Sequence, residues 1–449
     1  MTMHDEASRE QLRIELEGVL GDATSCLAIS HMFGLGPNVS IAEYAASITS
    51  ARNSSDEMER QSLRGWQLTL TDDSVADRLG QLVDQALEPF VEGGRVQLPD
   101  MGHGDRPDGH PTSTLVQRLL QLLALHGANV TARRFVDSLD DAACAYQDLT
   151  LLRGVTVKEE IEVFDGVRLV PSHRHDGRPS PLAPVDLLDE NSRRRFQLNA
   201  ILVQDCKAHP RYMRPSEWAA KADRVGDGEP FSRSRPQADS KPFDRDAFCH
   251  ALTLATDSPV VWCAVWEQLE SDEIVNVSDF ACSTYWYQDV RHAPSRLVPQ
   301  QEHIDEAKRI YSAFMSHDEG TLRKLDIAFE RLDQASNSQN ALIDLAIALE
   351  VMYLSDRGGG LKQRLKTRVA RHLGADLEER KQIANLMAAF YGARSQLVHS
   401  GDLKPSYKVQ GRGMVSIFDL RNEVAALCMR ALRSIVTDGM PDLEALDLG

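Results

Sequence analysis

The sequence predicts an α+β protein, with a mixed α/β amino-terminal region followed by an all-α helical bundle. Apolar residues first recur at helical spacing, then alternate between Leu149 and Val170, and return to helical spacing after Gln300 almost to the end. A chain of 449 residues also exceeds what one hydrophobic core usually covers, so several domains are expected. The expected domains are residues 1–148 (mostly helical), 149–298 (mixed α/β) and 299–449 (helical).

Periodicity predicts the elements of the first two domains. Helical spacing is clear over Val75–Leu87, Leu115–Leu125 and Ala132–Tyr146. The stretch VTVKEEIEVFDGVRLV then alternates, and the Asp165-Gly166 pair predicts a two-residue hairpin turn within it. Val260–Trp266 is apolar enough to predict a buried strand.

The third domain is expected to begin near Pro294–Gln301 and to be helical. A final helix is predicted over Asp419–Ile435. The apolar positions that recur at helical spacing before it are Leu322, Leu325, Phe329 and Leu332, and later Ile383, Met387, Phe390 and Leu397.

Composition indicates a soluble, cytoplasmic protein. Seven cysteines, an odd number, form no CxxC pair, so the sequence indicates neither a disulfide framework nor a cysteine zinc site, and it favours a reducing compartment. The start of the chain lacks the pattern of a signal peptide, and no apolar run is long enough for a membrane span. The net charge of −17 excludes a protein that coats nucleic acid non-specifically. Residues 361–412 reverse that balance locally, with eleven basic against four acidic residues.

The segment YGARSQLVHSG carries the chemistry most directly. It places Arg394 and His399 five residues apart at the end of an amphipathic stretch. Arginine presents a planar, permanently charged fork that matches phosphate oxygens, and histidine is the side chain whose ordinary pKa lies nearest neutral pH. Together they suit cleavage of a phosphodiester.

Glu350 is the expected partner of Arg394. Both residues have apolar neighbours three and four positions away on a helix, so both are expected to face inward. A buried charge needs a partner, which predicts that the two side chains share one pocket. The alternative is that this pair is purely structural and that His399 is simply exposed before a glycine turn.

The spacing of five limits how one helix can use both groups. Five residues turn an ideal helix by about 140°, so Arg394 and His399 of one chain diverge, whereas Ser395 and His399 share a face. Either the helix ends near Ser400 and Gly401, or the cleft is assembled from two chains. We favour a two-chain cleft with the helix also ending there.

Four ordered segments carry a family resemblance: LDIAFERL, ALIDLAIALEVMYLSD, LKTRVARHLG and ERKQIANLMAAFYGARSQLVHSG. Residues 321–401 resemble the Apea-like branch of the HEPN superfamily, whose nucleases carry an RxxxxH motif with a polar residue directly after the arginine. The resemblance implies a helical bundle that dimerises through its motif helices. It also implies a metal-independent ribonuclease of bacterial toxin and anti-phage defence systems.

Carried over residue by residue, the resemblance implies a catalytic pair of Arg394 and His399, with Ser395 at the polar position and Glu350 at the acidic one. The expected reaction is attack of the ribose 2′-hydroxyl on the adjacent phosphate, with RNA as the substrate and transfer RNA as one candidate class. The candidate substrate-binding residues are Arg368, Tyr391 and Lys404. A homodimer, and a phage-derived trigger acting through the upstream region, are the expected partners.

One alternative function stays open. The helical domain could instead be a catalytically silent dimerisation or RNA-binding module.

The histidine pairs His103/His110 and His173/His175 lie in Gly- and Pro-rich stretches without a metal-ligand pattern, so they are expected to be loop residues. No metal and no cofactor are expected.

Overall fold

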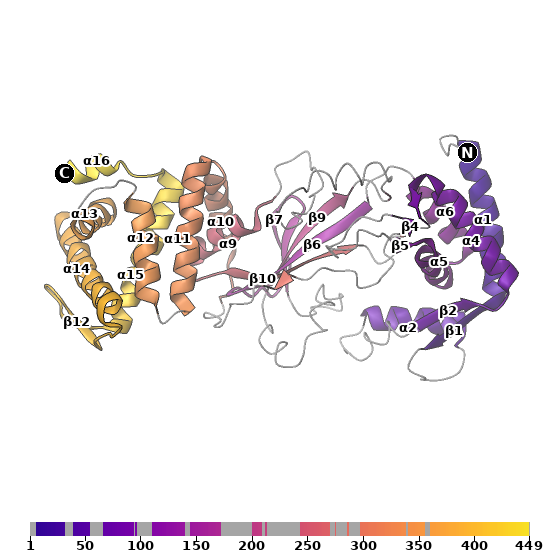
Figure 1. The fold of residues 1–449 in the computed structure, drawn as a ribbon, viewed down its shortest axis with the longest axis horizontal. Helices are drawn as coiled ribbons and strands as arrows, with labels where there is room; N and C mark the ends of the chain where they lie inside the picture. The colour runs from indigo at the N-terminus through magenta and orange to yellow at the C-terminus, as the bar shows by residue number, and fades with distance from the viewer. Residues whose placement is uncertain are drawn as a thin grey trace. The chain divides into compact units, whose positions relative to one another are not determined.

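The computed structural model divides the chain into two compact units, which are described separately. One unit comprises residues 1–152, 157–243 and 263–286, and the other comprises residues 153–156, 244–262 and 287–449. The structure describes residues 6–31, 39–53, 66–93, 95–96, 110–139, 144–171, 200–208, 212, 243–269, 274, 285–286, 297–337, 340–354 and 360–448. Figure 1 shows the elements of both units.

The first unit combines helices with small antiparallel sheets around one core. Strand β1 pairs with β2 from Leu27↔Leu70 to His31↔Trp66. In α4, the Asp72 carboxylate accepts the Ser74 and Val75 amides, and Val75, Leu79 and Val83 recur on the buried face. The elements of this part are α1 (Glu6–Cys26), β1 (Leu27–His31), α2 (Ile41–Asn53), β2 (Trp66–Leu70), α4 (Asp73–Leu87), η2 (Glu88–Phe90), β3 (Val91–Glu92), β4 (Arg95–Val96), β5 (His110–Pro111), α5 (Thr112–His126) and α6 (Ala128–Ser138).

The largest sheet has the strand order β11-β10-β6-β9-β8-β7. Its strands β7, β8, β9 and β6 pair antiparallel in succession, and Gly166 turns β7 into β8 with a φ of 69°, a conformation that favours glycine. The strands are β6 (Cys144–Arg153), β7 (Ile161–Phe164), β8 (Val167–Pro171), β9 (Ala200–Ala208), β10 (Val261–Leu269) and β11 (Tyr285–Trp286).

The second unit is a helical bundle with one added β-hairpin. Helix α12 is buried on almost every side, which makes it the central element of the bundle. It packs against α11, α13, α14 and α15. The elements are α9 (Arg245–Thr256), α10 (Gln301–Phe314), α11 (Glu319–Asn337), α12 (Ala341–Tyr353), α13 (Leu361–Leu373), α14 (Leu377–Ser400), β12 (Ser406–Val409), β13 (Gly413–Ser416), α15 (Ile417–Asp438) and α16 (Leu443–Leu448).

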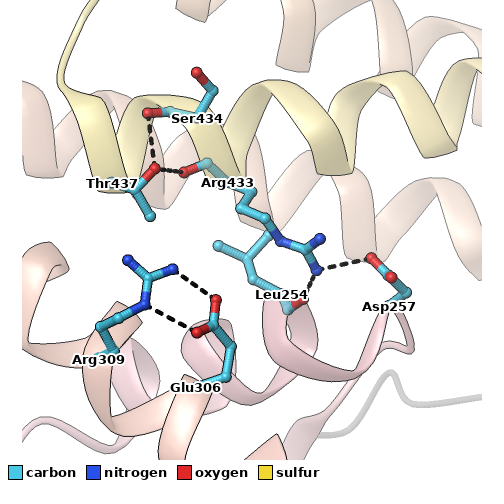
Figure 2. Close-up of polar contacts among 7 residues, drawn as sticks. All are labelled: Leu254, Asp257, Glu306, Arg309, Arg433, Ser434 and Thr437. Carbon is cyan, nitrogen blue, oxygen red and sulfur yellow. Dashed lines mark hydrogen bonds and ion pairs between the residues drawn. The ribbon is translucent and has the colours of Figure 1, made fainter.

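Helix α9 is held in this bundle by a cation at its carboxyl end. Figure 2 shows the Arg433 guanidinium of α15 reaching the Leu254 carbonyl and the Asp257 carboxylate, the latter at 2.9 Å. A cation at this position offsets the helix dipole. On α10, Arg309 binds Glu306 through both carboxylate oxygens and, together with the charge of Arg433, lowers the pKa of that carboxyl.

An aromatic stack also holds α9 in the bundle. The His250 ring lies parallel to the Phe329 ring of α11 at 3.9 Å, with the Phe314 ring of α10 5.9 Å away. The residue as a whole keeps some solvent exposure, but its Nδ1 is buried and has no hydrogen-bond partner within the described part of the chain. Burial lowers the pKa of His250 to about 4, against a smaller opposing effect of Asp244.

The predicted α+β class is confirmed, and several predicted elements differ in their bounds. The expected helix over 132–146 ends at Ser138, because residues from Cys144 onward pair with β9 instead. The helical unit begins its main run at Gln301, close to the expected boundary, but it also includes α9. A linear division of the chain missed α9 because its apolar face packs on α10, far along the sequence. The β12–β13 hairpin was also not expected in an all-α bundle.

The buried His250 predicts a defined loss of stability in acid. In the unfolded chain its pKa returns to about 6.5, so the unfolded state alone takes up a proton as the pH falls from 6.5 to 4. The contribution of His250 to the free energy of unfolding is therefore complete above pH 6.5. Below that pH it is lost by up to about 1.4 kcal/mol per pH unit. The His250→Phe variant should lose less stability between these pH values in urea unfolding. Parallel pH profiles of the two proteins would contradict this prediction.

Candidate active site

The motif segment lies at the end of helix α14. The Asp376 carboxylate caps the start of the helix by accepting the Glu379 amide at 2.8 Å. The helix continues to Ser400, and Gly401 ends it with a φ of 74° and an amide bonded to the Leu397 carbonyl. The expected glycine cap is therefore present, and α14 carries Arg394 and His399 on one uninterrupted helix.

Arg394 is half-buried and rests on an aromatic ring. Its guanidinium carbon lies 5.7 Å from the centroid of the Tyr391 ring, within the range of a cation–π contact. Its Nε is buried without a hydrogen-bond acceptor within the described residues. A buried donor of this kind carries the desolvation cost of an unmade hydrogen bond, which an anion placed beside it would remove.

Tyr391 links Arg394 to Glu350. The Tyr391 hydroxyl donates a hydrogen bond to Glu350 Oε1, across the contact between α14 and α12. Burial first, and then this hydrogen bond and the charge of Glu350, raise the pKa of Tyr391 far above its ordinary value, while Arg394 opposes the shift. The hydroxyl therefore stays protonated at physiological pH and acts as a donor.

The expected direct ion pair between Arg394 and Glu350 is not formed. The two residues do belong to one cluster, since both act on the pKa of Tyr391, but no ion pair among the described residues joins them. Tyr391 contacts both residues instead: its hydroxyl satisfies the carboxylate of Glu350, and its ring lies against the guanidinium of Arg394.

His399 is exposed, and Ser395 one turn earlier is half-buried. On a regular helix His399 lies about 7.5 Å along the axis from Arg394 and is rotated by about 140° from it. Ser395 and His399 share a face, as expected from their spacing of four. Within one chain the helix therefore presents the arginine and the histidine in different directions.

A β-hairpin that was not predicted packs against α14. The Tyr407 hydroxyl donates to Gln396 Oε1 at 3.2 Å and accepts the Lys404 amide at 3.1 Å. The Asn385 side chain donates to the Gln410 carbonyl at 3.1 Å. These contacts fix the loop that follows His399 and leave Lys404 exposed beside it. The alternation in SYKV was the available signal, but strands this short are ambiguous from sequence alone.

Arg368, a candidate substrate-binding residue, is enclosed in the bundle. Its side chain is 2% exposed, and it binds both oxygens of Asp447 and the Tyr353 carbonyl. A guanidinium enclosed in this way cannot contact substrate in solvent while α16 stays in place. Substrate binding by Arg368 therefore stays a prediction, and it requires that Asp447 leave the guanidinium.

The structure contains no metal-ligand cluster of three His, Cys, Asp or Glu residues within its described part. The histidines His103, His173 and His175 lie outside the described residues, as does the side chain of His110. Across the described ranges, none of the helices combines the length and the apolar character needed to cross a membrane.

Comparisons of the chain with protein-family models, with curated proteins and with solved structures give no match.

The hydrogen bond between Tyr391 and Glu350 predicts a measurable cost. The Tyr391→Phe variant keeps the ring beneath Arg394 and removes only the donor to a charged acceptor, which typically contributes about 1.5 to 3 kcal/mol. Urea unfolding should report a loss in that range. The Tyr407→Phe variant is the matched control, since it removes bonds to two neutral groups, the Gln396 side chain and the exposed Lys404 amide, and should cost no more than about 1.5 kcal/mol. Equal losses for the two variants would contradict the special role of Glu350.

Proposed function

We propose that the protein is a metal-independent RNA endonuclease that acts in bacterial anti-phage defence and cleaves RNA through attack of the 2′-hydroxyl. The observation that carries the proposal is Arg394, a half-buried guanidinium on an aromatic ring with a buried Nε that lacks an acceptor, on the same helix as the exposed His399. A phosphate oxygen would supply that acceptor. The assignment to anti-phage defence is supported by the family resemblance of the four ordered segments.

In this proposal the residues divide the reaction between them. His399 removes the proton from the 2′-hydroxyl or returns one to the leaving 5′-oxygen. Arg394 stabilises the negative charge that builds on the non-bridging oxygens as the P–O bond forms and the leaving bond breaks. Tyr391 and Glu350 hold Arg394 in place, Ser395 lies on the face of His399, and Lys404 contacts the backbone of the RNA.

The proposed site is completed by a second copy of the chain. Divergence of Arg394 and His399 on one helix requires a group from elsewhere at the same phosphate. Large apolar side chains around the end of α14 are exposed, although α14, the hairpin and α15 pack together. Burial of such side chains is a usual source of affinity between subunits. They are Val398 (50%), Leu403 (37%), Met414 (65%) and Phe418 (60%).

A silent dimerisation or RNA-binding module is the second candidate. One observation favours it, namely that a single chain does not direct Arg394 and His399 to a common point. The two candidates differ in whether RNA is cut at all, so a cleavage assay separates them.

The first test is RNA cleavage in excess chelator. Purified full-length chain incubated with total RNA should leave 2′,3′-cyclic phosphate and 5′-hydroxyl ends. The His399→Ala variant should be slower by about 10² to 10⁴-fold, as expected for loss of an acid–base group. Arg394→Lys keeps the charge but loses the fork, and should be slower by about 10² to 10³-fold.

Because His399 is exposed, its substitution should leave the stability of the fold nearly unchanged. Urea unfolding of each variant serves as the control. Cleavage by His399→Ala at the wild-type rate would sink the catalytic assignment. Binding of RNA without cutting, under conditions that also include phage-infected cell extract as a source of the trigger, would favour the silent module.

The two-chain site predicts complementation. Arg394→Ala and His399→Ala proteins should each be inactive, but an equal mixture after subunit exchange should recover about one quarter of wild-type activity. Random exchange makes half of the dimers mixed, and each mixed dimer has one intact site. Sedimentation of the mixture establishes that dimers are present. A mixture of dimers that stays inactive would place both groups of a site in one chain and exclude the composite cleft.

A further inference from the structure

Helix α16 is a small element held on the bundle mainly by charge. It contacts α13 and makes no comparably extensive contact with any other described element (Figure 1). Asp442 begins it by accepting the Glu444 and Ala445 amides. None of its described side chains is fully buried. A six-residue helix is too short to be stable by itself, so α16 depends on its contacts with α13.

Those contacts centre on Arg368. Its Nε and Nη2 donate to the two carboxylate oxygens of Asp447 at 2.9 and 2.6 Å, and its Nη1 donates to the Tyr353 carbonyl at 2.6 Å. On the next turn of α13, Arg371 donates to the Leu446 carbonyl at 2.6 Å. The fork of Arg368 thus holds a carboxylate in the paired geometry that it would equally offer to a phosphate.

The two partners of this ion pair differ in exposure. The Arg368 side chain is 2% exposed, whereas that of Asp447 is 38% exposed. The cation is therefore built into the bundle, and the anion comes from a peripheral helix. Elements with few buried apolar contacts are those that open locally at the lowest free energy. Undocking of α16 would remove the carboxylate from Arg368 and leave a preformed cationic fork, which then requires another anion.

We propose that Arg368 and Arg371 form a phosphate-binding site that Asp447 occupies in cis, and that opening of α16 exchanges the carboxylate for a backbone phosphate of RNA. The anion site stands on the geometry alone, whereas the choice of RNA rests on the proposed function. Its position suits that role. Tyr353, which accepts from Arg368, lies three residues beyond Glu350 on α12, about 4.5 Å along the axis. Arg368 and the cluster of Glu350, Tyr391 and Arg394 therefore both lie at the final turn of α12.

The competing interpretation is that Asp447 only neutralises a buried arginine. That role predicts that loss of the carboxylate destabilises the bundle without creating affinity for phosphate. The exchange role predicts a gain of binding.

The experiment measures binding of a short fluorescein-labelled single-stranded RNA by anisotropy, with every chain carrying His399→Ala so that the RNA is not cut. The Asp447→Asn variant removes the charge but keeps the shape, and should bind RNA roughly tenfold more tightly than the parent. Glu444→Gln is the matched control, because it removes the same charge from an exposed position of the same helix. It should change the affinity less than about twofold.

The outcomes separate the claims. Equal affinities of Asp447→Asn and Glu444→Gln would overturn the exchange. Tighter binding of inorganic phosphate by Asp447→Asn, without tighter binding of RNA, would keep the anion site and overturn the RNA assignment. If Asp447→Asn binds RNA more tightly but the protein with its native His399 never cuts RNA, this inference stands and the proposed nuclease is refuted. Cleavage of RNA by the wild-type protein, with no gain of RNA binding in Asp447→Asn, would support the proposed nuclease and overturn this inference.

A second measurement needs no variant and covers the case in which Asp447→Asn does not fold. Phosphate that competes with Asp447 should reduce the hydrogen-exchange protection of the Leu446 amide in wild-type protein, relative to chloride at equal ionic strength. Unchanged protection up to saturating phosphate would contradict the exchange.

Discussion

The arrangement of the candidate site depends on one hydrogen bond, from the Tyr391 hydroxyl to the Glu350 carboxylate. Glu350 projects from α12, the most enclosed helix of the bundle, where an ionised carboxylate without a donor would be costly. Tyr391 supplies that donor and joins α12 to α14 at a fixed register. The same ring then lies beneath Arg394, so the interaction that satisfies the carboxylate also positions the cation. The geometry of the candidate site and the stability of the core thus depend on the same contact.

The carboxyl end of α12 gathers cations from two directions. Arg394 approaches through the Tyr391 ring, and Arg368 binds the Tyr353 carbonyl directly. The carbonyl groups at the end of a helix carry partial negative charge, which favours cations at this position. Arginine serves at both places because its weakly hydrated, planar group tolerates partial burial better than a lysine ammonium does. The bundle therefore concentrates positive charge at one end of a central helix, within a chain of net charge −17.

What the sequence could predict follows from the range of each interaction. Helix α14 and its cap were predictable because apolar periodicity and a glycine at the helix end are local signals, and Gly401 adopts the left-handed conformation that was expected. The shared location of Glu350 and Arg394 was predictable from their apolar faces. The Tyr391 hydroxyl between them was not predictable, because spacing along a helix gives the direction of a side chain but not which group on another helix it contacts. The burial of Arg368 was not predictable for a related reason: its partner Asp447 is 79 residues away, and nothing local marks such an ion pair.

A ribonuclease of the proposed kind has to be restrained in its own cell, and the two proposals would supply two independent means. One is incompleteness: a single α14 directs Arg394 and His399 apart, so the proposed reaction would need a second chain at the same phosphate. The other is occupancy: Asp447 binds the fork of Arg368, and the proposed exchange would need α16 to open. The first depends on protein concentration and the second does not. Together they would make cutting conditional on both assembly and the arrival of RNA, since a long polyanion is the ligand able to reach both cationic sites along the end of α12.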